Sequence, residues 1–171
     1  MQKNKDMMRD PIEVLMKEHD EGLQQLKRLG DAAEYIRING FSNDTFVTIS
    51  TAICFIDTEI RRHNEKEEKF LFPLMERHVS APPGVMRSEH RELWRAFTRL
   101  HESVEDVEEG RISATTVREL VQSSKALVDL LTSHILKENT VLFPMARQVL
   151  TGEEYELLRE NISNATSLVI K

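Results

Sequence analysis

The stretch HNEKEEKFLFP at residues 63–73 returns as HILKENTVLFP at residues 134–144, 71 positions further along the chain. Each copy begins with a His, carries a Glu four residues later and ends in Leu-Phe-Pro. Residues four apart lie on one face of an α-helix, about one turn from each other. The repeat therefore predicts a molecule built from two similar halves, each of which offers an imidazole and a carboxylate on one helix face.

The same offset of 71 also matches His19 with His90. His19 lies eight residues past Pro11 and Glu67 six before Pro73, so both should sit about 9–12 Å from adjacent ends of antiparallel helices. In the second half His90 lies six residues past Gly84 and Glu138 lies six before Pro144, so the same argument applies. We therefore expect six side chains to converge at one level near one end of the fold: His19, His63, Glu67, His90, His134 and Glu138.

Four long segments carry apolar residues at spacings of three and four, which is the pattern of amphipathic helices. Asp10 is the expected N-cap of the first, with Pro11 at the first helical position. We expect Pro73 to end the second segment and Pro144 to kink or end the fourth. The predicted helices cover about residues 11–39, 43–73, 85–110 and 114–144, and a shorter one covers about 151–166.

The connections between the long segments are short, which favours antiparallel neighbours. The predicted fold is all-α: an up-down-up-down four-helix bundle with a pseudo-twofold internal repeat, plus a short C-terminal helix. We expect one domain over residues 1–171, with the core of the bundle at about 11–146.

Composition excludes several classes of protein. The net charge of −6 is a poor match for nucleic acid, and a single Cys rules out a disulfide framework. No apolar run approaches the roughly 20 residues that span a bilayer, and the polar N-terminus lacks a signal-peptide core. We expect a cytoplasmic protein with neither nucleic acid nor membrane as a partner.

Four imidazoles and two carboxylates in an apolar interior make poor sense as packing, because buried ionised carboxylates need counter-ions. Two metal ions would supply that charge, with two His for each ion and both carboxylates shared. Mixed imidazole and carboxylate ligation with open positions suits iron better than manganese or zinc.

These residues resemble the hemerythrin-like family of HHE cation-binding domains, whose signature is a His, a His-x-x-x-Glu, another His and another His-x-x-x-Glu. The match covers about residues 11–146 and includes each Leu-Phe-Pro. The resemblance implies a non-heme di-iron site with an oxo or hydroxo bridge. It assigns His19, His63, His90 and His134 as terminal ligands, and Glu67 and Glu138 as bridging carboxylates.

Two features set the chain apart from the oxygen-carrying hemerythrins, which have a fifth His four residues after the third. Here that position is Trp94, and His134 and Glu138 keep the shorter of the family's spacings. Both features resemble the bacterial non-heme di-iron branch, which includes proteins of iron-sulfur cluster repair and nitric oxide defence. Those repair proteins usually carry an N-terminal Cys-containing segment, for which we expect no room in this chain.

Three functions remain open from the sequence. The resemblance implies binding of, or reaction with, dioxygen, nitric oxide or peroxide, in oxidative or nitrosative stress or in iron homeostasis. The alternatives are a catalytic nitric oxide reductase or peroxidase, whose electrons would come from a separate donor protein, and an iron or redox sensor. The residues do not decide whether the chain is an enzyme.

For several polar residues near the predicted site we expect structural or surface roles and no direct contact with the metal ions. Glu68 should point about 100° away from Glu67 and form a salt bridge. Glu18 and Glu89 should be solvated, with a contact to the site as the alternative that their repetition leaves open. His101 is expected to be a core residue or to lie in a polar layer behind the site.

Overall fold

The computed structural model describes residues 10–167, and every regular element in that range is a helix. Five helices are longer than ten residues: α2 (Pro11–Asn39), α3 (Asn43–Phe55), α6 (Pro82–Glu108), α7 (Ala114–Lys137) and α9 (Gly152–Ser167). The shorter elements are η1 (Ile56–Ile60), α4 (Arg61–Lys66), η2 (Glu67–Leu71), α5 (Phe72–Met75), η3 (Glu138–Leu142) and α8 (Phe143–Val149).

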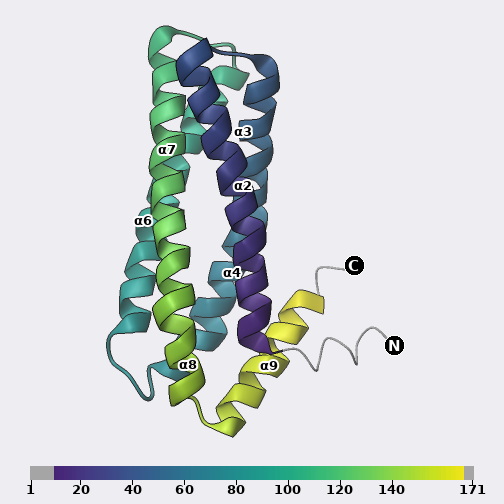
Figure 1. Ribbon diagram of the computed structural model, residues 1–171, viewed down its shortest axis with the longest axis vertical. Coiled ribbons are helices and arrows are strands. Elements are labelled where there is room, and N and C mark those ends of the chain that lie inside the picture. Colours follow the sequence, from purple (N-terminus) through teal and green to yellow (C-terminus); the bar gives the residue numbers. More distant parts are fainter. Residues whose placement is uncertain (1–9, 168–171) are drawn as a thin grey trace.

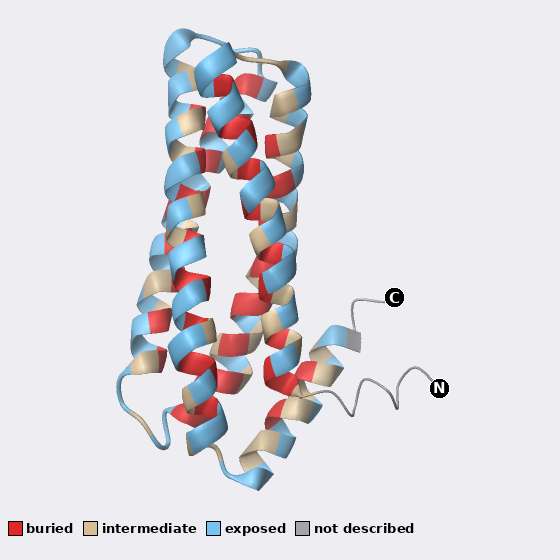
Figure 2. Ribbon diagram, in the orientation of Figure 1, coloured by how far each residue is buried: buried red, intermediate tan, exposed pale blue. Residues whose placement is uncertain are grey.

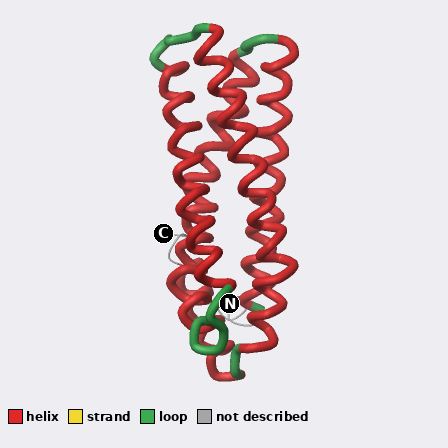
Figure 3. Tube along the Cα trace, turned by 90° about the vertical axis from the view of Figure 1, so that its left-hand side faces the viewer, coloured by secondary structure: helices red, strands yellow, loops and turns green. Residues whose placement is uncertain are grey.

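The helices form an elongated bundle (Figure 1). Helix α2 packs against α3 and α7, and α6 packs against α7. The elements from α3 to α5 follow one another without a loop, as do those from α7 to α8. The loops at 40–42 and 109–113 lie at one end of the bundle, while α9 crosses the other end beside the start of α2 (Figures 1 and 3).

Capping side chains mark the starts of three long helices, and the predicted cap Asp10 is one of them. Oδ1 of Asp10 accepts hydrogen bonds from the backbone N–H groups of Ile12 and Glu13, and Pro11 occupies the first turn of α2. Ser42 and Ser113 cap α3 and α7 in the same way. These oxygens satisfy N–H groups that have no partner within the helix. Helix α6 begins at Pro82, three residues before the expected start.

The expectation that Pro73 ends its helix is wrong, and Pro144 does not end its helix either. Both prolines sit in helices that continue, α5 and α8, each directly after a π-helical turn. In these turns the N–H of Phe72 donates to the carbonyl of Glu67, five residues back, and Phe143 donates to Glu138 in the same way. A wider turn before the proline lets the helix accommodate a residue that has no N–H.

Buried apolar residues form two clusters inside the bundle (Figure 2). The larger includes Leu26, Ile53, Leu100 and Leu127, and it fills the long part of the molecule. The smaller lies at the α9 end, where Leu158 and Ile162 of α9 pack with Phe72 and Phe143. No helix within residues 10–167 combines the length and apolar character that crossing a membrane requires.

Candidate metal centre

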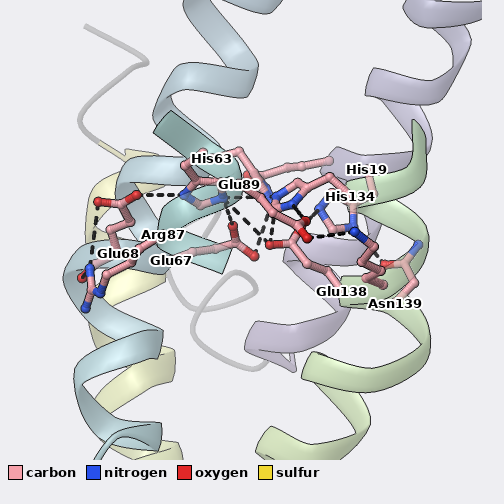
Figure 4. A network of polar contacts seen from close by, with 12 residues as sticks. His19, His63, Glu67, Glu68, Arg87, Glu89, His134, Glu138 and Asn139 are labelled. Carbon is pink, nitrogen blue, oxygen red and sulfur yellow. Dashed lines mark hydrogen bonds and ion pairs between the residues drawn. The ribbon is translucent and has the colours of Figure 1, made fainter. Parts of the chain in front are cut away.

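The structure brings all six predicted side chains together, and each is at most 2% exposed. They form two groups in which one ligand atom of each member lies within 4.8 Å of the others. The first group holds His19 and His63, the second holds His90 and His134, and Glu67 and Glu138 belong to both. The carboxylates lie between the imidazoles (Figure 4).

Each carboxylate presents one oxygen to each group. Oε2 of Glu138 lies 3.1 Å from Nε2 of His19, while its Oε1 lies 3.0 Å from Nε2 of His134. Oε1 of Glu67 lies 3.5 Å from Nε2 of His63, while its Oε2 lies 3.6 Å from Nε2 of His90. The two carboxylates therefore belong to both groups, and each group could hold a metal ion.

The outer nitrogen of every imidazole faces an oxygen acceptor. The four Nδ1 contacts are His63 to Glu18 at 2.8 Å, His134 to Glu89 at 3.0 Å, His90 to Glu68 at 2.7 Å and His19 to Asn139 at 2.7 Å. An ionised carboxylate or an amide oxygen can only accept, so Nδ1 carries a proton, and in the neutral, metal-binding form of each ring Nε2 turns a lone pair to the centre. Such outer hydrogen bonds orient imidazoles that bind metals.

These contacts correct two expectations. Glu18 and Glu89 are not simply solvated, because each holds an imidazole with one oxygen and a lysine, Lys66 or Lys137, with the other. Glu68 does pair with an arginine, Arg87, but it also accepts from His90. The contacts of Glu18 and Glu89 could have been predicted from the sequence, because these two residues are themselves 71 positions apart.

The residues that contact the outer nitrogens of the imidazoles are only partly repeated between the two halves of the chain. Glu18 with Lys66 is repeated as Glu89 with Lys137. Glu68, however, corresponds to Asn139, and its partner Arg87 corresponds to Met16. A charged pair behind His90 is therefore replaced by neutral residues at the positions behind His19.

Unpartnered polar atoms at the centre fit a cation. Nε2 of His19, Nε2 of His63 and all four carboxylate oxygens of Glu67 and Glu138 are buried without a hydrogen-bond partner. Nε2 of His90 also lies 3.0 Å from Nε2 of His134, and both rings use Nδ1 as a donor. In neutral rings these two nitrogens would be facing lone pairs, which, like orphaned carboxylate oxygens, are costly in an apolar interior unless a proton or a cation lies between them.

The electrostatics of the cluster point the same way. Burial opposes the charge on Glu138, but the nearby imidazoles of His134, His19 and His90 outweigh it and hold the pKa of Glu138 well below its usual value. Burial likewise disfavours a charged His63, yet Glu67 and Glu18 raise the pKa of His63 to about 10. The site is thus built to hold positive charge against two buried carboxylates.

The remaining histidines lie apart from this cluster. His101 is not a core residue, because its side chain is 47% exposed and faces Glu105 on the same helix. Nε2 of His78 pairs with Glu154 near the start of α9, in keeping with the surface position of this stretch. Trp94 is partly buried, and the guanidinium of Arg61 lies 3.9 Å above its ring.

Comparison with known proteins agrees with this geometry. The family described as the hemerythrin HHE cation-binding domain matches residues 10–146. The chain belongs to this family. As a hemerythrin HHE domain it contains the whole six-residue cluster within the matched range, whereas α9 lies beyond it.

Curated relatives of this HHE domain carry the name "Iron-sulfur cluster repair protein YtfE". The protein from Cronobacter sakazakii is 29% identical over 146 residues, covering 82% of this chain and 65% of the relative. Those from Escherichia coli (strain SMS-3-5 / SECEC) and Shigella boydii serotype 18 are each 28% identical over 145 residues, covering 82% of this chain and 64% of the relative. The chain thus spans a little under two thirds of the length of these relatives.

Proposed function

We propose that this protein is a hemerythrin-like di-iron protein that binds or reacts with dioxygen, nitric oxide or peroxide. The observation that carries the proposal is the placement of Glu67 and Glu138, each with one oxygen toward an imidazole of either group. The proposal includes an up-down-up-down bundle with a pseudo-twofold axis through this cluster.

In the proposed site His19 and His63 would hold one ion, His90 and His134 would hold the other, and Glu67 and Glu138 would serve both. Each ion then has four protein donors, which leaves positions for an oxo or hydroxo bridge and for an exogenous ligand. Iron held there would supply redox chemistry for a reaction with a diatomic molecule. The protein's own part is to fix the imidazoles through Glu18, Glu68, Glu89 and Asn139 and to exclude water with the apolar clusters on either side.

Iron is favoured over manganese and zinc by the mixed nitrogen and oxygen donors and by family membership. The name of the YtfE relatives supports a place in the repair of iron-sulfur clusters. A sustained reaction would need a separate electron-donor protein.

Metal analysis of the iron-loaded protein, with its near-ultraviolet spectrum, tests the proposal. We expect two irons per chain and charge-transfer absorption in the wild type. Glu67→Ala and Glu138→Ala should lose iron while the far-ultraviolet circular dichroism of the helices is retained. Glu65→Ala, two residues away on the exposed face, is the matched control and should keep both irons.

Retention of two irons in both Glu67→Ala and Glu138→Ala would show that the ligand assignment is wrong. Exposure to nitric oxide then separates the open functions. One reversible adduct per centre indicates a binding protein, whereas repeated turnover with a reductant indicates a reductase.

A further inference from the structure

Asn64 is a buried polar residue that the predicted metal site does not use. It follows His63 in the sequence and is 4% exposed, yet its side-chain Nδ2 has no hydrogen-bond partner. A buried N–H group without a partner keeps the full cost of its desolvation, so such groups are rare in folded proteins. The side-chain Nδ2 of Asn64 is therefore available to a bound group that accepts a hydrogen bond.

Asn64 lines a small cavity among η1, α4, α6 and α7. The cavity has a volume of about 10 Å³, and its seven other lining side chains are aliphatic or aromatic, including Ile60, Leu93, Trp94 and Leu131. A cavity of this size holds about one water-sized group. Asn64 is thus the one polar residue in the lining of this cavity.

Helix spacing places this cavity directly beside the cluster of imidazoles. Trp94 lies four residues after His90, and Leu131 lies three before His134. Residues three or four apart are neighbours on one helix face, so these lining residues sit about one turn from the imidazoles.

The corresponding positions on the other side of the pseudo-twofold axis differ in size and polarity. Asn64 corresponds to Ile135, and Leu93 corresponds to Gly22. There a Cβ on Gly22 would lie 2.8 Å from Cδ1 of Ile60, so the Ile60 side chain already fills that space. The two sides of the metal centre are therefore unequal, and Asn64 belongs to one side only.

We propose that this cavity receives the outer atom of a diatomic ligand at the metal centre, and that Nδ2 of Asn64 donates a hydrogen bond to it. This inference rests on the proposed function and names the ligand class more closely: a diatomic molecule with an oxygen at its outer end, such as dioxygen or nitric oxide. The hydrogen bond slows release of the ligand, and the apolar walls with Trp94 limit its size.

The test compares Asn64→Leu with wild type in the iron-loaded protein, with nitric oxide as the probe. Leu has the branching and the number of side-chain heavy atoms of Asn but no donor. We expect two irons in both proteins, about tenfold faster release of nitric oxide from Asn64→Leu, and loss of the deuterium shift of the N–O stretch, because one hydrogen bond is worth roughly a factor of ten. Ile135→Leu, at the corresponding position, should release nitric oxide at the wild-type rate.

The metal-free protein gives a second readout that does not depend on iron. If Asn64 exists to bind a ligand, Asn64→Leu should raise the melting temperature, because a buried orphan donor has been removed. A lower melting temperature, or loss of iron, would show a structural role and overturn the inference. Unchanged nitric oxide release would overturn it while leaving the di-iron proposal intact, whereas a wild type that binds no iron would overturn both.

Discussion

At the scale of single residues, the site depends on which nitrogen of each imidazole faces outward. Four oxygen acceptors hold the Nδ1 atoms, and this leaves Nε2 free toward the two carboxylates. The acceptor on His90 is a carboxylate, Glu68, whereas the acceptor on His19 is the amide of Asn139. A carboxylate makes an imidazole a stronger electron donor than an amide does. The two groups should therefore differ in affinity for a metal ion.

Glu68→Gln tests this difference at the His90 side. We expect the affinity for one of the two ions to fall by about 10–100-fold, the usual effect of removing an outer partner of a ligating His. A titration against a competing chelator would resolve the two binding steps. Glu76→Gln is the matched control, because Glu76 also pairs with Arg87 and its side chain is as exposed as that of Glu68, at 41%. Equal effects of both substitutions would assign the role to Arg87 instead.

The residues of the site differ in how far the sequence could predict them. The six central side chains could be predicted, because the 71-residue repeat and the helix spacing can both be seen in the sequence itself. The contact between Glu68 and His90 joins η2 to α6, and no periodicity within one helix predicts it. The unpaired side-chain N–H of Asn64 could not be predicted either, because a buried donor without a partner is recognised only once its surroundings are known.

At the scale of elements, the starts of α2, α3 and α7 agree with the predicted ones, whereas the start of α6 and the effects of Pro73 and Pro144 do not. Asp10, Ser42 and Ser113 carry oxygens that accept from the first turn, which is a local property of the sequence. The π-helical turns at Glu67–Leu71 and Glu138–Leu142 are different. No capping side chain marks them, and each is followed by a helix that continues through Pro73 or Pro144.

Helix α9 is the element that closes the end of the bundle nearest the site, and its packing can be tested directly. Leu158 is fully buried in the smaller apolar cluster, whereas its neighbour Leu157 is 45% exposed. Leu158→Ala should lower the free energy of unfolding by about 2–5 kcal/mol through lost burial and a residual cavity. Leu157→Ala should change it by less than about 0.5 kcal/mol. Chemical denaturation of both variants measures the difference, and equal losses would mean that α9 does not pack as described.

At the scale of the whole molecule, the site joins the two halves of the chain. His19 and His63 come from the first half and His90 and His134 from the second, and each carboxylate faces one imidazole of each half. Bound cations would therefore tie together the four helical columns that carry these residues. A ligand that binds only the folded state stabilises it, so metal binding should raise the stability of the entire bundle.

The metal-free molecule should show a characteristic dependence of stability on pH. Glu67 and Glu18 outweigh burial and raise the pKa of His63 from its ordinary 6.5 to about 10. Its stabilising contribution is then complete below pH 6.5 and is lost as the pH rises toward 10. For Glu138 the pKa is depressed below the ordinary 4.5, so its contribution is present above pH 4.5 and is lost in more acidic solution.

These two groups predict that the chelator-treated protein is most stable between about pH 4.5 and 6.5 and that its melting temperature falls steadily toward pH 10. Iron-loaded protein should lose much of the alkaline decline, because the bound ions, unlike protons on imidazole, still balance the carboxylates at high pH. Glu67→Gln should flatten the decline in the metal-free protein, since Glu67 makes the largest contribution that raises the pKa of His63. A melting temperature that rises between pH 6.5 and 9 in the metal-free wild type would contradict this account of the buried cluster.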